Sequence, residues 1–87
     1  MRFDDITWTA AVREKVEGRH GLAIEEVESA MFDRKARIRR AARARYGLLG
    51  RSSSGAYITV LFAYEDRIAR IITARRMDLS ERRIYRR

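Results

Sequence analysis

Cysteine and proline are absent from this sequence of 87 residues, and histidine occurs once. Without cysteine the chain can form neither a disulfide bond nor a thiolate metal site. A single histidine also falls short of the three or four side-chain ligands that a bound zinc ion needs. We therefore expect no metal site and no cofactor.

Long apolar runs are missing as well. The first residues, MRFDDITW, are acidic where a signal peptide would be apolar, and no stretch approaches the roughly 18 apolar residues of a membrane span. A chain of this length has room for one modest core. We expect a single domain over residues 1–87, a cytoplasmic location and no membrane partner.

Basic residues are abundant and unevenly placed. The net charge is +8, and arginine supplies 18 of the 20 basic residues. Residues 1–33 carry 4 basic and 8 acidic groups, whereas residues 34–87 carry 16 and 4. Guanidinium groups bind phosphate in a bidentate way that ammonium groups cannot match. The pattern favours an anionic partner, with RNA or DNA first among them.

The hydrophobic pattern predicts an α+β fold with two N-terminal helices, a small antiparallel sheet of about four strands and one C-terminal helix. A short strand over residues 3–8 comes before the helices. We expect two helices, one from Thr9 to Gly18 or Gly21 and one over 23–32. They are followed by two strands joined by a bend within 34–51 and a loop at 51–55. Two further strands at 56–64 and 67–75 flank a turn at Glu65-Asp66, and a helix follows Asp78.

Two of these helices carry more specific signals. In the second, Ile24, Val27, Met31 and Phe32 form an apolar stripe at helical spacing. In the last, Asp78 and Glu81 have the spacing of a capping box. Three apolar residues of that helix are expected to dock it on the sheet; they are Leu79, Ile84 and Tyr85.

Arg70 and Arg75 stand at odd spacing on the last predicted strand. In regular alternation they point to opposite faces, so both can face solvent only if the strand bulges or ends between them. One interpretation pairs Arg70 with an acid, either Glu65 or Glu81. The other makes the two arginines part of a basic floor for a phosphodiester backbone.

Three further residue types are candidates for chemistry or for base stacking. His20 is the one side chain whose unperturbed pKa suits proton transfer near neutrality, although a lone histidine beside glycine is commonly a surface or capping residue. Tyr46 and Tyr85 each lie beside arginines, which favours stacking on a nucleobase. Trp8 and Tyr57 are interpreted as core residues.

The order of motifs resembles the BrnT family of type II toxin–antitoxin toxins, which are small RelE-like ribonucleases. The family signature of an aromatic residue, a His twelve positions later and a following Glu-Glu is matched by Trp8, His20 and Glu25-Glu26. Its closing motifs resemble the segments 70–75 (RIITAR) and 81–85 (ERRIY). The family shows Glu-x-Arg where this chain has Arg43-x-Arg45.

The resemblance implies a RelE-like fold and metal-independent RNA cleavage that inhibits translation. It also implies neutralisation by a cognate antitoxin with a ribbon-helix-helix DNA-binding region, and a homodimer within the complex. Among the residues, it implies phosphate and transition-state roles for Arg45, Arg70 and Arg75. Proton-transfer roles are expected among His20, Glu81 and Tyr85, and RNA contacts at Arg43, Tyr46, Arg51 and Arg76.

Two alternatives come from other functional classes. A non-catalytic nucleic-acid-binding module fits the basic C-terminal part of the chain and Arg43 in place of the family's acid. A protein-interaction subunit would use the same arginines to meet an acidic partner.

Overall fold

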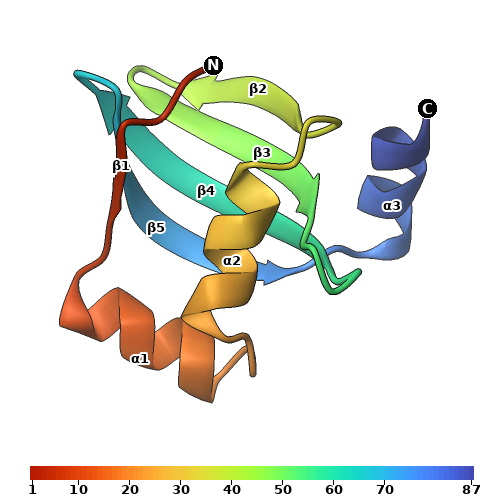
Figure 1. Cartoon of the computed structure of the whole chain (residues 1–87), viewed down its shortest axis with the longest axis horizontal. Coiled ribbons are helices and arrows are strands. Elements are labelled where there is room, and N and C mark those ends of the chain that lie inside the picture. The colour runs from red at the N-terminus through yellow and green to blue at the C-terminus, as the bar shows by residue number, and fades with distance from the viewer.

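The computed structural model describes residues 1–87 as three helices and one sheet of five strands (Figure 1). The α+β class expected from the sequence is confirmed. In chain order the elements are β1 (Asp5–Thr7), α1 (Ala10–Gly18), α2 (Ile24–Met31), β2 (Arg37–Ala42), β3 (Arg45–Arg51), β4 (Tyr57–Glu65), β5 (Ile68–Arg76) and α3 (Leu79–Arg86).

The sheet is mixed rather than purely antiparallel. Its strand order is β1-β5-β4-β3-β2, and β2 to β5 form the expected antiparallel meander. The correction concerns β1, which adds a fifth strand parallel to β5 with Asp5 opposite Ile68. A strand of three residues carries too little sequence pattern to predict which strand it pairs with. Its parallel direction follows from the path of the chain, which runs through both helices and the meander before β5 returns to this edge.

The two N-terminal helices begin where their local chemistry favours it. The Thr9 hydroxyl caps α1 by accepting a hydrogen bond from the Val12 amide at 3.2 Å. Helix α2 lacks a side-chain cap, but Glu25 and Glu26 in its first turn complement the positive end of the helix dipole. Both helices therefore start within a residue or so of their predicted positions.

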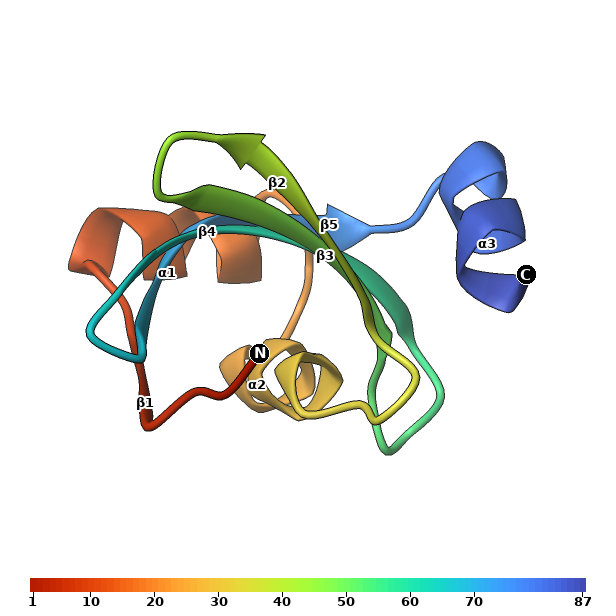
Figure 2. The same cartoon turned by 90° about the horizontal axis from the view of Figure 1, so that it is seen from above.

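Helices α1 and α2 pack on the same face of the sheet, which curves around α2 (Figure 2). We call this the covered face. Val16 of α1 and Val27 of α2 are fully buried against it. Phe32, expected in the buried stripe, is 61% exposed because α2 ends at Met31. The strands contribute seven buried residues to this face, namely Leu48, Ile58, Val60, Phe62, Ala69, Ile71 and Ala74.

Gly50 lets α2 approach the sheet closely. A Cβ atom added at this position would lie 2.3 Å from the carbonyl oxygen of Ala30. No side chain fits there without moving the backbone of α2. The contact sets the position of the C-terminal end of α2, and with it Asp33 in the loop that follows.

A β-bulge at Ile72 determines which way the last strand points its arginines. Leu61 of β4 pairs with Thr73 and Phe62 pairs with Ile71, so Ile72 is an extra residue on β5. Because of it, Ala74 is buried on the same face as Ile71, and Arg70 and Arg75 both lie on the other face. Regular alternation allows both arginines on one face only if the strand bulges or ends between them, and β5 has a bulge there.

Helix α3 stands apart from the other two helices at the far edge of the molecule (Figure 1). Its capping box is confirmed, since Asp78 accepts from the Glu81 amide and Glu81 accepts from the Asp78 amide. No residue of α3 is buried, and Leu79, expected to dock it, is 70% exposed. The half-buried Ile84 and Tyr85 supply the apolar contact instead. None of the three helices has the length and apolar content that crossing a membrane requires.

The turn between β4 and β5 lies one residue later than expected. Its central residues are Asp66 and Arg67, which have φ angles of 51° and 63°. Positive φ at both central positions is the geometry that matches the twist of a two-residue hairpin.

Candidate functional site

Six arginines from three strands share the face of the sheet that α1 and α2 leave uncovered. We call this the open face. Strand alternation and the register of pairing place their side chains opposite the buried residues of the covered face. The six are Arg37, Arg39, Arg45, Arg51, Arg70 and Arg75.

The register arranges these arginines in rows across the strands. Arg45 and Arg70 flank Ala63 in one row, about 10 Å apart by strand spacing. In the row nearest α3, the order is Arg37, Leu49, Thr59 and Arg75. The open face is therefore a cationic floor with short, uncharged residues between its arginines.

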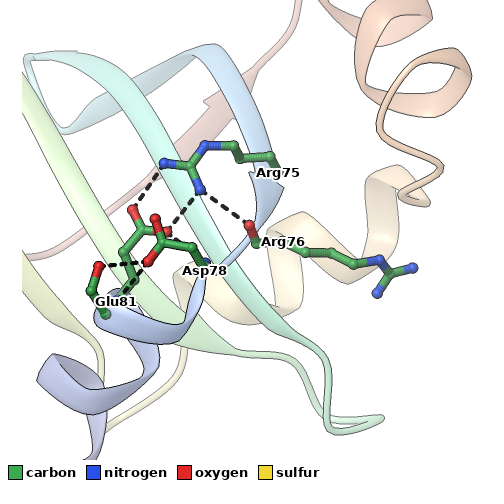
Figure 3. A network of polar contacts seen from close by, with 5 residues as sticks. Arg75, Arg76, Asp78 and Glu81 are labelled. Carbon is green, nitrogen blue, oxygen red and sulfur yellow. Dashed lines mark hydrogen bonds and ion pairs between the residues drawn. The ribbon is translucent and has the colours of Figure 1, made fainter.

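Arg75 and Glu81 form a bidentate ion pair between β5 and α3 (Figure 3). Arg75 Nη1 donates to Glu81 Oε1 at 2.7 Å, and Nη2 donates to Oε2 at 2.9 Å. The hydrogen bond to Glu81 raises the pKa of Arg75, and the one from Arg75 lowers the pKa of Glu81. Both groups are charged at neutral pH. The pairing of Arg70 with Glu65 or Glu81 is thus wrong, because Arg70 forms no ion pair.

The capping box holds the Glu81 carboxylate in place. Its Oε1 accepts from the Asp78 amide at 2.9 Å as well as from Arg75, so one acid both begins α3 and orients the guanidinium. Figure 3 shows Arg75, Asp78 and Glu81 gathered at this junction. Arg75 also donates to the Arg76 carbonyl at 3.1 Å. Three acceptors on two segments therefore fix the Arg75 guanidinium.

A groove of about 440 Å³ opens between α3 and the open face beside this pair. The Thr59 side chain, directly opposite Arg75 in the sheet, contributes a hydroxyl that is buried without a hydrogen-bond partner. That hydroxyl also helps to lower the pKa of Glu81, although its geometry falls short of a hydrogen bond. The lining comprises Arg37, Ile38, Arg39, Gly47, Leu48, Leu49, Thr59, Glu81, Ile84 and Arg87.

Tyr85 attaches α3 to the loop after α2. Its hydroxyl donates to Asp33 Oδ2, which also accepts from the Arg51 amide at 2.8 Å. Burial, together with the hydrogen bond to Asp33, raises the pKa of Tyr85 to about 12. Burial opposes the shift at Asp33, but hydrogen bonds from Tyr85 and two backbone amides leave its pKa lowered. Tyr85 therefore serves as a fixed donor to Asp33.

Four residues named from the sequence lie away from the groove. His20 follows α1, and Tyr46 is on the covered face, where its ring stacks on Phe62 with centroids 5.9 Å apart. Arg76 lies opposite the buried Ile58, and its charge helps to lower the pKa of Glu26 on α2. The fourth residue, Arg43, lies in the turn between β2 and β3.

Sequence reasoning missed several residues of this region. Arg37 and Arg39 have a usable signal, because arginines at alternate positions of a strand share a face. Tyr57, interpreted as a core residue, is surrounded by guanidinium groups, whereas Trp8 does pack against the core and donates to Glu28 at 2.9 Å. Asp33 had no signal, since its partner Tyr85 is 52 residues away.

Comparison with models of protein families identifies the family of this chain. The model of the family described as the ribonuclease toxin, BrnT, of type II toxin–antitoxin systems matches residues 8–81. The chain belongs to the BrnT family. It is therefore a ribonuclease toxin, with RNA as its substrate class and a cognate antitoxin as its partner.

A solved structure agrees on the fold. The crystal structure of the Brucella abortus ribonuclease toxin BrnT superposes with a TM-score of 0.69 and 19% sequence identity. The match covers 85% of this chain and 96% of that one. No curated protein matches the chain. At this identity the likeness establishes the shared fold, and residue roles have to be argued from this chain's own geometry.

Proposed function

We propose that this BrnT chain is a metal-independent endoribonuclease whose active site is the open face beside the Arg75–Glu81 pair. The observation that carries the proposal is the position of this pair, at the end of an arginine-lined floor and next to a groove with an unpartnered Thr59 hydroxyl. The chain acts as a single domain in the cytoplasm.

The reaction is attack of a ribose 2′-hydroxyl on the adjacent phosphate. The O2′–P bond forms, the P–O5′ bond breaks, and negative charge builds up on the phosphoryl oxygens between these events. Arg75 stabilises that charge beside the groove, because fixed cationic donors act where charge develops. Arg45 and Arg70 lie in the row at Ala63, about 13 Å along β4 from Thr59, and bind the adjoining RNA backbone. Guanidinium groups remain protonated and therefore cannot take the 2′-hydroxyl proton.

Glu81 is the group best placed for the proton transfer. When an RNA phosphate takes over the Arg75 guanidinium, the carboxylate loses its ion-pair partner and becomes a better base. It accepts the 2′-hydroxyl proton and returns a proton to the leaving 5′ oxygen. His20 and Tyr85 are not assigned to this step, since His20 follows α1 and Tyr85 is committed to Asp33.

The decisive experiment incubates purified protein with RNA in excess chelator. We expect cleavage to fragments with 2′,3′-cyclic phosphate and 5′-hydroxyl ends, and we expect Arg75→Ala to abolish it. Arg13→Ala on α1 removes one charge far from the groove and is the matched control. Intact RNA with the wild-type protein would refute the proposal, and binding without cleavage would support a non-catalytic nucleic-acid-binding module.

Glu81→Gln tests the role of the carboxylate. As a base, Glu81 is essential, and the variant is slower than the wild type at every RNA concentration. If Glu81 only shields Arg75, the variant binds RNA more tightly and cleaves at least as fast.

The partner proposed for this toxin is an antitoxin with a ribbon-helix-helix DNA-binding region, which covers the basic open face in a complex that contains a toxin homodimer. Co-expression with the neighbouring open reading frame followed by light scattering tests this. A stable complex of defined mass is expected, and a toxin that purifies alone counts against it.

A further inference from the structure

Three guanidinium groups surround the ring of Tyr57 at the start of β4. The Cζ atoms of Arg82, Arg51 and Arg86 lie 4.4, 4.9 and 5.2 Å from the ring centroid. The hydrogen bond from Arg86 Nη2 to the Tyr57 hydroxyl, at 2.9 Å, and the nearby guanidinium charges lower the pKa of Tyr57 against the effect of burial. Two of these arginines come from α3 and one from β3, so tertiary structure assembles the cluster.

None of the three arginines has an acidic partner. The ion pairs of the chain are Arg2–Asp4, Arg67–Asp4 and Arg75–Glu81. The nearby acid, Asp33, already accepts from the Tyr85 hydroxyl and from two backbone amides. Guanidinium groups gathered on one aromatic ring repel one another, and no carboxylate of the protein forms an ion pair with them to offset this. The cluster is thus a built cationic site that lacks its counter-charge.

The cluster borders a hollow of about 830 Å³ that no acidic side chain lines. Six of its ten lining residues are basic; they are Arg34, Lys35, Arg37, Arg51, Arg86 and Arg87. Arg37 and Arg87 also line the groove beside Arg75, so the two hollows are adjacent. Tyr57 lies two residues before Thr59 on the same face of β4, a separation of about 7 Å along the strand.

We propose that the Arg51, Arg82 and Arg86 cluster around Tyr57 is a binding subsite for a backbone phosphate of the RNA, next to the phosphate that is cleaved at Arg75. This inference rests on the proposed function and adds a second contact to it. Phosphate is the favoured ligand because forked guanidinium donors match its oxygens and because the subsite continues the open face. The family match ends at Glu81, so two of the three arginines come from a segment outside it.

The subsite binds and positions the RNA, whereas the residues at the groove carry out the cleavage step. Arg86→Gln and Arg82→Gln should therefore raise KM and leave kcat nearly unchanged, whereas Arg75→Ala lowers kcat. Arg83→Gln is the matched control, because it removes the same charge from an exposed position of α3 that contacts neither Tyr57 nor either hollow.

The test measures binding of a short, fully 2′-O-methylated oligoribonucleotide by fluorescence anisotropy at several salt concentrations. This probe lacks the attacking hydroxyl, so its binding is independent of catalysis. Loss of one phosphate contact should reduce the log–log salt slope by about 0.7 and weaken binding about fivefold at 0.1 M salt. We expect this for Arg86→Gln and for Arg82→Gln, and a much smaller change for Arg83→Gln.

Equal salt slopes for Arg86→Gln and Arg83→Gln would overturn the inference. So would an Arg86→Gln variant that binds the probe like the control and loses only its affinity for the antitoxin, since the cluster would then be a protein contact. A wild-type protein that binds the probe with the expected slope but cleaves no RNA would refute the proposed catalysis and leave the subsite intact.

Discussion

On the covered face, β3 to β5 bury seven apolar side chains under α1 and α2, whereas the open face of the same sheet exposes six arginines. Neighbours in sequence belong to different faces, as Leu61 and Phe62 do. Because strand residues alternate, one stretch of chain can supply both the core and a cationic surface. Under the proposed function, stability and RNA recognition in this toxin depend on separable sets of residues.

Deletion of Ile72 should disrupt the separation of buried and exposed side chains on β5 and should have the largest effect on stability. Without the extra residue, either Ala74 or the pair Ala69 and Ile71 must turn to the open face, because a shift of one residue reverses the faces of a strand. We expect the cooperative urea transition to disappear. Ile72→Val keeps the chain length and should unfold much like the wild type, and a deletion variant with a wild-type midpoint would contradict the assignment.

Phe62→Ala and Leu61→Ala compare the faces at adjacent positions. Phe62 is fully buried, so its truncation should lower the free energy of unfolding by about 3–5 kcal/mol. Leu61 is half-buried on the open face, and its truncation should lower the free energy of unfolding by about 1 kcal/mol. Urea unfolding monitored by circular dichroism measures both. Similar losses at the two positions would show that the open face carries part of the core.

Arg70→Gln should affect activity and leave stability nearly unchanged. Arg70 has no ion pair and is exposed, so the free energy of unfolding should change by no more than about 0.5 kcal/mol. The RNA cleavage rate at low RNA concentration should fall about fivefold at 0.1 M salt, in line with the loss of one backbone-phosphate contact. The control is Arg13→Gln on α1. Cleavage at the wild-type rate would show that Arg70 makes no such contact.

Tyr85→Phe should have the smallest effect and the most specific pH signature. Loss of the hydrogen bond to Asp33 should lower the free energy of unfolding by about 1 kcal/mol at neutral pH. The folded pKa of Tyr85, about 12, exceeds the unfolded value near 10. Its contribution is therefore complete below pH 10 and is lost as the pH rises toward 12. The difference between wild type and variant should narrow over that range, and a constant difference would exclude this ionisation.

Local patterns predicted much of the fold from the sequence. The Asp78 and Glu81 capping box involves four consecutive residues, so its position was correct. The start of α1 was predicted at Thr9, one residue before the observed Ala10. The direction of β1 was not predictable in this way, because its partner Ile68 is far away in the chain. Phe32 and Leu79 were wrong as buried residues because helical periodicity does not say where the packing partner ends.

The candidate site was predicted less completely for a related reason. Arg75 and Glu81 are six residues apart, yet which arginine met the acid depended on the bulge at Ile72. The sequence neighbours of Tyr46 and Tyr57 suggested the opposite assignment, since Tyr46 follows Arg45 and Tyr57 lies between Ala56 and Ile58. In the structure, Tyr46 shares a face with the buried Leu48 and Tyr57 shares one with Thr59. Assigning them required knowing which face the helices cover. That information lies in tertiary contacts.

The pairing of β1 with β5 also has a consequence for synthesis on the ribosome. Asp5 finds its partner Ile68 only after nearly the whole chain has been translated, and the core residues of β5 arrive equally late. Such non-local pairing delays folding until the last strand is available. A nascent chain that has not yet reached the end of β5 therefore lacks both the bulged strand and Arg75, the residue proposed for the active site.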